Sequence, residues 1–302
     1  MDFGPWMEID EASKYEAPFE YVKRKVYPVR KDNRRPSYAE KWWRHVEPRP
    51  RMVRALNGLR RLLVTVLTSK HRLFRWIDPR VLPDHKLVVL ARDDDFWFGV
   101  LHSSVHESWS RSVGAQVRDV KSGFTYTPTT CFETFPLPWS PGEEPTDDPL
   151  HQEIGAAAAD LNRDRERWLN PPEWIEPIAR AVDAEDDFAD VPEEARPLIR
   201  ESAIMARAAK DAKLKKRTLT NLYNERPTWL QLAHERLDRA VLAAYAAVDP
   251  DGDWNADWAD VWKETGAGQP LPEGHALVER RAEVDQAVLA NLLQMNMARA
   301  GE

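Results

Sequence analysis

The chain has 302 residues, 42% of them hydrophobic, which is enough to bury a sizeable core and suggests about two domains. No apolar run approaches the roughly 20 residues of a membrane-spanning helix, and the acidic N-terminus lacks the basic and then apolar pattern of a secretory signal. The single cysteine, Cys131, excludes an intrachain disulfide and a multi-cysteine zinc site. We therefore expect a cytoplasmic protein without membrane contacts, stabilised by packing.

The net charge of −7 hides a strong asymmetry along the chain. Residues 21–80 hold 18 Lys and Arg against 4 Asp and Glu, whereas residues 141–302 carry a net charge of −14. Clustered cations attract phosphates through their local field, whatever the total charge. Aromatic residues interleave these cations, and this favours a phosphate-binding surface. The alternative is a basic face that pairs with the acidic helices of the second half.

The first 90 residues predict short helices followed by a small sheet. We expect helices at 19–26 and 37–46, the second with Ser37 as N-cap and Glu40 completing a capping box. Trp42 and Trp43 cannot both face one way on a helix, so one should lie in the core and the other should be partly exposed. Three short apolar runs then predict antiparallel strands, at 62–67, 73–77 and 87–90. Lys70, His71 and Arg72 should lie on a turn between strands.

A single amphipathic helix is predicted at 96–113, with Asp95 as its cap. His102 and His106 have the spacing of a metal pair on this helix. No third ligand belongs to a motif, and Glu107 follows the second His rather than the first, where a zincin motif has its Glu. We therefore predict no metal site.

Residues 124–138 combine threonines, aromatics and prolines without a helical period, which predicts an extended segment. It could hold hydroxyls against a polar partner, or join two domains with its aromatics in the core. Beyond it, residues 141–149 predict a proline-rich linker. The remaining sequence predicts a proline-rich, acidic stretch that is irregular in part at 170–198. It also predicts helices at 150–169, 199–222, from Thr228 and at 276–298.

These elements predict an α+β protein. A small mixed α/β domain at 1–140 precedes the linker, and a mainly helical C-terminal domain follows at 150–302.

Several sequence blocks occur in an order that resembles the order in a known protein family. They include Phe19 to Val22, Lys31 to Arg35, Ala91 to Ser103, Tyr126 to Pro136 and Arg217 to Leu230. Over most of residues 16–248 the chain is similar to the target-recognition and C-terminal helical regions of MmeI-like restriction–modification proteins, which are large single-chain adenine-specific DNA methyltransferases. Tyr126 to Pro136 and the Leu-Thr-Asn-Leu-Tyr-Asn block at 219–224 are the most specific.

The resemblance implies a methyltransferase portion before the recognition region, so Met1 falls in the middle of the family architecture. The chain would then be a split, truncated or stand-alone piece. A missing or partner methyltransferase domain would bind S-adenosylmethionine. Two motifs resemble parts of a methyltransferase site within this chain. Asn170-Pro171-Pro172-Glu173 is similar to the adenine-binding motif of amino-methyltransferases, and Gly266-Ala267-Gly268 is similar to a cofactor-binding turn. The first has Glu173 where an aromatic should stack on the flipped base, and no strand precedes the second. No catalytic residue is assigned.

The resulting hypothesis is that residues 1–140 read double-stranded DNA. Side chains at the basic end would hold phosphates: Arg34, Arg35, Lys41, Lys70 and Arg72. A second group would approach base edges or adjacent phosphates: Arg118, Lys121, Tyr126, Thr129 and Thr130. Two alternatives stay open, a protein-interaction subunit without DNA binding and the remnant of a truncated methyltransferase gene.

Overall fold

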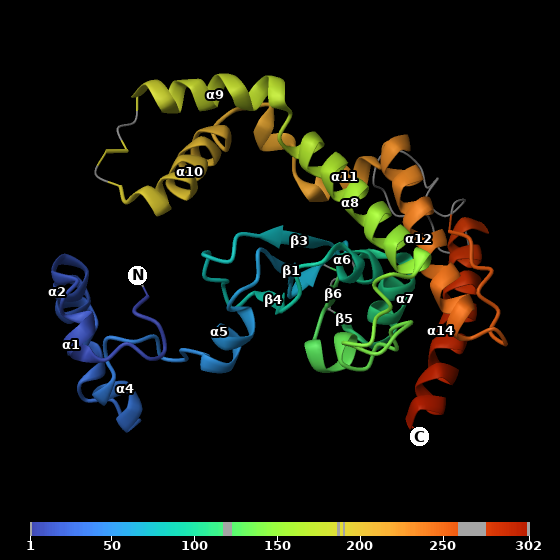
Figure 1. The fold of residues 1–302 in the computed structure, drawn as a ribbon, viewed down its shortest axis with the longest axis horizontal. Helices are drawn as coiled ribbons and strands as arrows, with labels where there is room; N and C mark the ends of the chain where they lie inside the picture. The colour runs from blue at the N-terminus through green and yellow to red at the C-terminus, as the bar shows by residue number, and fades with distance from the viewer. Residues whose placement is uncertain (1, 117–122, 186–187, 190, 259–275, 301–302) are drawn as a thin grey trace. The chain divides into compact units, whose positions relative to one another are not determined.

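The structure is a computed structural model that describes residues 2–116, 123–185, 188–189, 191–258 and 276–300 (Figure 1). It divides into two compact units, Met1–Leu62 and Leu63–Glu302. This division differs from the predicted one, which placed the boundary at 141–149. The reason is that the second unit contains one continuous core, described below.

Unit 1 is formed by short helices around a small aromatic core. The helices are α1 (Ile9–Ala12), α2 (Glu16–Lys25), α3 (Tyr27–Arg30), α4 (Pro36–Glu40) and α5 (Pro50–Leu56). Phe3, Phe19, Trp42 and Trp43 are buried together. The expectation of one partly exposed Trp was wrong, because α4 ends at Glu40 and both rings follow it in a turn. The predicted capping box is also absent: α4 begins at Pro36, whose missing N–H suits the first turn of a helix.

Unit 2 contains two three-stranded sheets. The strands are β1 (Leu62–Val66), β2 (Thr68–Ser69), β3 (Phe74–Ile77), β4 (Leu87–Leu90), β5 (Ala115–Gln116) and β6 (Phe124–Thr125). The first sheet has the order β3-β1-β4, with β1 antiparallel to β4 and Leu63 opposite Leu90. This confirms the strands predicted from the apolar runs. The second sheet, β2-β6-β5, was not predicted, because each strand has only two residues and is too short for a periodic pattern.

The predicted helix at 96–113 is two helices, α6 (Asp95–His102) and α7 (Ser104–Val113). Between them Ser103 is extended, with ψ of 159°, and its hydroxyl accepts a hydrogen bond from the His106 backbone N–H at 3.4 Å. Serine favours such a cap over a helix interior, so the break has a local cause. Asp94 rather than Asp95 caps α6, accepting from the Trp97 N–H at 2.9 Å.

The stretch 124–138 is extended only in part. After β6 the chain forms a π-helical turn, η2 (Pro128–Phe132), and so the prediction of a continuous extended segment was wrong. Pro128 lies in the first turn, where its missing N–H loses no helical hydrogen bond. Cys131 in this turn is buried, as a small apolar side chain would be.

The chain after residue 148 is mainly helical. Its elements are α8 (Pro149–Leu169), α9 (Pro172–Glu185), η3 (Glu193–Ala195), α10 (Arg196–Ala208), η4 (Leu214–Lys216), α11 (Leu219–Glu225), α12 (Thr228–Val248) and α14 (Ala276–Ala300). The stretch predicted to be irregular in part, 170–198, contains α9 and the start of α10. These two helices lie against each other, with Arg200 paired to Asp183 across them (Figure 1).

One core joins the sheet region of unit 2 to its long helices. Helix α8 packs against α6 and α12, and α14 packs against α7 (Figure 1). At Gly99 the contact is so close that an added Cβ would lie 2.8 Å from Ile154 Cγ2. The protein is therefore α+β as expected, but its C-terminal helices complete the core of the preceding segment. Within the described residues, no helix is long and apolar enough to cross a membrane.

Candidate nucleic-acid interface

In unit 1, three of the predicted phosphate-binding residues bracket α4. Arg34 and Arg35 precede the helix, Lys41 follows it, and all three are exposed. A five-residue helix is about 8 Å long, so the cations lie close enough to reach neighbouring phosphates. Arg35 Nη1 donates to the Tyr38 hydroxyl at 2.8 Å. Among residues 2–62, the side chains of Arg34 and Lys41 have neither a carboxylate partner nor a hydrogen bond.

Two other arginines of unit 1 are used by the fold itself. Arg44 is buried; its guanidinium donates to the carbonyls of Pro5, Trp6 and Met7 and pairs with Glu8 at 2.8 Å. Arg30 donates to the Trp42 and Arg44 carbonyls. These contacts fix the turn after α4 and thereby position Lys41.

In unit 2, Lys70 and His71 lie on the turn between β2 and β3, as predicted. The Asn224 side-chain oxygen on α11 accepts hydrogen bonds from both: Lys70 Nζ lies 2.9 Å away, and His71 Nε2 also lies 2.9 Å away. Burial, the largest influence, lowers the pKa of His71, so Lys70 carries the positive charge of this turn at neutral pH. The role of Asn224 was missed. Its block was recognised, but nothing in the sequence indicates which turn the amide contacts.

Arg72 is a correction, because it is buried rather than exposed on the turn. Its guanidinium donates to Thr65 Oγ1 at 3.0 Å and to the carbonyls of Val66 and Phe124. It also lies over the rings of Phe124 and Tyr126. Burial lowers its pKa to about 10, which leaves it charged at neutral pH. Arg72 therefore joins the two sheets and does not reach a phosphate on the surface.

Tyr126 is the second correction. Its ring is fully buried, and its hydroxyl lies 3.1 Å from His106 Nε2. Burial raises its pKa, so the phenol stays neutral. Thr129 and Thr130, in η2, are exposed. Of Tyr126, Thr129 and Thr130, only the two threonines can therefore contact a partner molecule.

Arg118 and Lys121 lie in residues 117–122, outside the described part of the chain. The described residue that follows this connection, Gly123, has φ of +86°, and a Cβ there would lie 1.9 Å from the Ser69 carbonyl oxygen. Only glycine fits this approach. Gly123 itself is thereby held next to Ser69 and the Lys70 turn.

The motifs that resembled catalytic or metal sites have structural roles where they are described. Asn170 ends α8, and its side chain donates to Glu166, while Pro172 begins α9; these residues do not fit an adenine-binding strand end. His102 accepts from the Phe74 N–H and lies 2.8 Å from the Tyr223 hydroxyl, so both its ring nitrogens are engaged within the protein. The same is true of His106, which contacts the Leu101 carbonyl and Tyr126. Gly266 and Gly268 lie outside the described residues.

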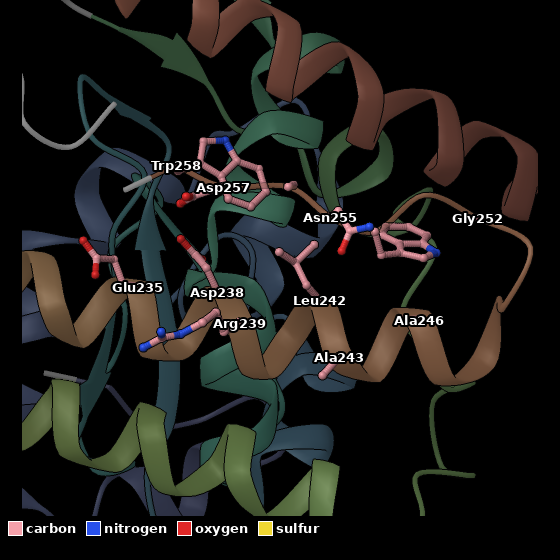
Figure 2. Close-up of a pocket in the computed structure, with 12 residues that line it drawn as sticks. Glu235, Asp238, Arg239, Leu242, Ala243, Ala246, Gly252, Asn255, Asp257 and Trp258 are labelled. Carbon is pink, nitrogen blue, oxygen red and sulfur yellow. The ribbon is translucent and has the colours of Figure 1, made fainter. Parts of the chain in front are cut away.

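A hollow of about 590 Å³ lies between α12 and residues 252–258 (Figure 2). Three carboxylates, Glu235, Asp238 and Asp257, lie at one end of it beside Trp258 (Figure 2). Asp238 is buried and accepts hydrogen bonds from the Ser104 N–H and hydroxyl, both at 2.7 Å, at the start of α7. Arg239 lines the hollow together with these carboxyl groups, and we do not assign the hollow to the nucleic-acid interface.

The first half of the chain is similar to a known domain. Residues 6–139 match the model of the MmeI target recognition domain. Among solved structures, the Type IIL restriction-modification enzyme MmeI, solved in complex with DNA, is similar at 17% sequence identity and a TM-score of 0.47. That match covers 95% of this chain and 28% of the MmeI chain. No curated protein matches. The part of the chain that is similar to the MmeI target recognition domain is therefore residues 6–139.

Proposed function

We propose that this chain binds double-stranded DNA and recognises its sequence for a site-specific, adenine-specific DNA methyltransferase of a restriction–modification or phage-defence system. The match of residues 6–139 to a target recognition domain carries the proposal. The exposed cations around α4 and on the Lys70 turn support it. In this proposal methyl transfer and S-adenosylmethionine belong to another domain or to a partner subunit, and the protein works in the cytoplasm, where DNA is accessible.

The proposed roles are limited to side chains that the structure does not bury, together with Arg118 and Lys121. Arg34, Arg35, Lys41 and Lys70 hold phosphates and so set the register of the protein on the duplex. Thr129 and Thr130, together with Arg118 and Lys121, approach base edges, where an Arg can bond guanine through two atoms. Arg72 and Tyr126 support the second sheet from inside and leave the set of DNA contacts.

The salt dependence of duplex binding tests the proposal. If about six phosphates are neutralised, the logarithm of the affinity should fall with the logarithm of the salt concentration at a slope near −5. The double variant R34A/R35A should weaken binding equally for all sequences, whereas R118A should change preference among sites by about 1–3 kcal/mol. Fluorescence anisotropy with labelled duplexes measures both.

A slope near zero, or no binding to a random duplex at low salt, would contradict the proposal and favour a protein-interaction subunit. Uniform loss in both variants would remove Arg118 from the base-reading set while leaving DNA binding intact.

A further inference from the structure

A basic loop, Lys210–Arg217, joins α10 to α11 within the acidic second half of the chain. It holds five cations in eight residues: Lys210, Lys213, Lys215, Lys216 and Arg217. Its one acidic residue is Asp211. The carboxylate of Asp211 accepts hydrogen bonds from the backbone N–H groups of Lys213 at 2.8 Å and Leu214 at 3.0 Å, and these bonds lower its pKa. This carboxylate is therefore used by the backbone of the loop itself.

The lysines of the basic loop differ from most arginines of the neighbouring helices. Lys210, Lys215 and Lys216 are exposed, and none has a carboxylate partner within the described residues. By contrast, Arg163, Arg200 and Arg207 pair with Asp160, Asp183 and Glu185. The charge of the helices is thus largely compensated, whereas that of the basic loop is available to a polyanion.

The basic loop is also fixed in position. Arg217 lies between the rings of Trp168 and Trp174, 4.8 and 4.7 Å from their centroids, and donates to the Trp168 carbonyl at 2.6 Å. Asn221 on α11 donates to the Lys216 carbonyl at 2.7 Å, and Leu214 is buried. A surface held this way loses little conformational entropy when it binds.

Helix α11 connects the basic loop to the Lys70 turn. Asn224, which binds Lys70, lies eight residues after Lys216. Within α11, the helix rises about 7.5 Å from its first residue, Leu219, to Asn224 at 1.5 Å per residue. One DNA strand carries a phosphate for about every 3.4 Å of helix axis, so this length of α11 alone spans about two phosphates.

We propose that the basic loop and Lys70 form one row of phosphate-binding cations along α11, the phosphate track, which holds the DNA backbone without reading sequence. This inference rests on the proposed DNA binding. The basic loop is in the helical part of the chain, beyond the segment that matches the recognition domain, whereas Lys70 lies within that segment. It extends the contact with DNA from the recognition segment onto the C-terminal helices.

The triple variant K210Q/K215Q/K216Q tests the track. Each neutralised phosphate contributes about 0.9 to the salt slope, so the slope of the full chain should become less steep by about 2 to 3, equally for every duplex sequence. The matched control R163Q/R180Q/R200Q removes the same charge from ion-paired arginines and should keep the wild-type slope. Fluorescence anisotropy with a random duplex, measured between about 50 and 300 mM KCl, gives the slopes. Thermal unfolding verifies that each variant is folded.

The two proposals fail in different ways. If wild-type protein binds DNA and the triple variant keeps its slope, the phosphate track is wrong while DNA recognition stands. If wild-type protein binds no duplex, the proposed function fails. Should the triple variant not fold, K215Q and K216Q are measured singly; each is expected to reduce the slope by about 0.9, and unchanged slopes in both overturn the track.

Discussion

Arg34 and Arg72 show how two arginines with the same predicted role are separated by their surroundings. Arg34 is exposed before α4, while Arg72 is buried among oxygen atoms of β1 and β6. The sequence places both in a basic region, but the acceptor that Phe124 provides to Arg72 comes from 52 residues away. Local charge therefore predicts a basic surface, but it does not identify which cations form contacts inside the protein.

Arg72→Ala is expected to lower the free energy of unfolding by about 2–4 kcal/mol, because it leaves buried carbonyls without donors and creates a cavity. Arg34→Ala is the matched control and should change stability by less than about 0.5 kcal/mol, as exposed substitutions usually do. Urea unfolding followed by tryptophan fluorescence compares the two. Equal midpoints would contradict the internal role of Arg72.

At the scale of elements, the close approach of α6 and α8 is the contact that most depends on one small residue. Gly99→Ala should destabilise the protein by about 1–3 kcal/mol, because the new methyl group meets Ile154 and Ala158 at 3.0 Å or less and forces the helices apart. Gly155→Ala, in the opposing helix, is the control. Its Cβ meets only the Phe96 backbone nitrogen at 3.8 Å, so the better helix propensity of alanine should stabilise by up to about 1 kcal/mol.

Thermal unfolding of the two glycine variants gives the sign of each change. Two stabilised variants would mean that α6 and α8 are further apart than described.

The long elements could be predicted from sequence, and several short ones could not. The apolar runs of β1, β3 and β4 and the period of α8 and α12 are strong local signals. The break at Ser103 was missed because the apolar stripe continues across it, although serine is a common cap. The strands β2, β5 and β6 exist only through their pairing, which brings Thr68 opposite Thr125, and no window of sequence contains that partner.

For the whole molecule, buried ionisable groups should make stability depend on pH in two opposing ways. Burial lowers the pKa of His106 to about 4 and that of His234 to about 3, and lowers that of His102 as well. Unfolding below pH 6.5 lets these imidazoles bind protons, so their contribution is complete above that pH and is lost as the pH falls. Burial instead raises the pKa of Asp238 to about 7, so this carboxyl favours the folded state at low pH and loses that effect as the pH rises from about 4 to 7.

The variant D238N separates the two effects. Its free energy of unfolding minus that of the wild type should increase with pH between about 4 and 7, by up to about 4 kcal/mol at about 1.4 kcal/mol for each pKa unit. D238N should therefore lose more stability than the wild type when the pH falls from 7 to 5. Urea unfolding across this range measures the difference. A constant difference would show that Asp238 does not titrate in this window.

The family resemblance identified the recognition segment, and the matched residues 6–139 end close to the predicted limit at 140. What the sequence did not reveal is that Leu63 to Leu137 and the later helices share a core. Proline and charge at 141–149 mark a surface connection, but they carry no information about what packs on either side of it.

This shared core has a consequence for chimeras. Exchanging residues 6–139 for the equivalent part of a relative would cut through the interior of unit 2, because the transplanted α6 and α7 must fit the resident α8, α12 and α14. A graft with a larger side chain at the position of Gly99 would meet Ile154 and lose stability. Exchanges should therefore be tolerated best when the exchanged piece is confined to surface turns or includes the helices that pack against it.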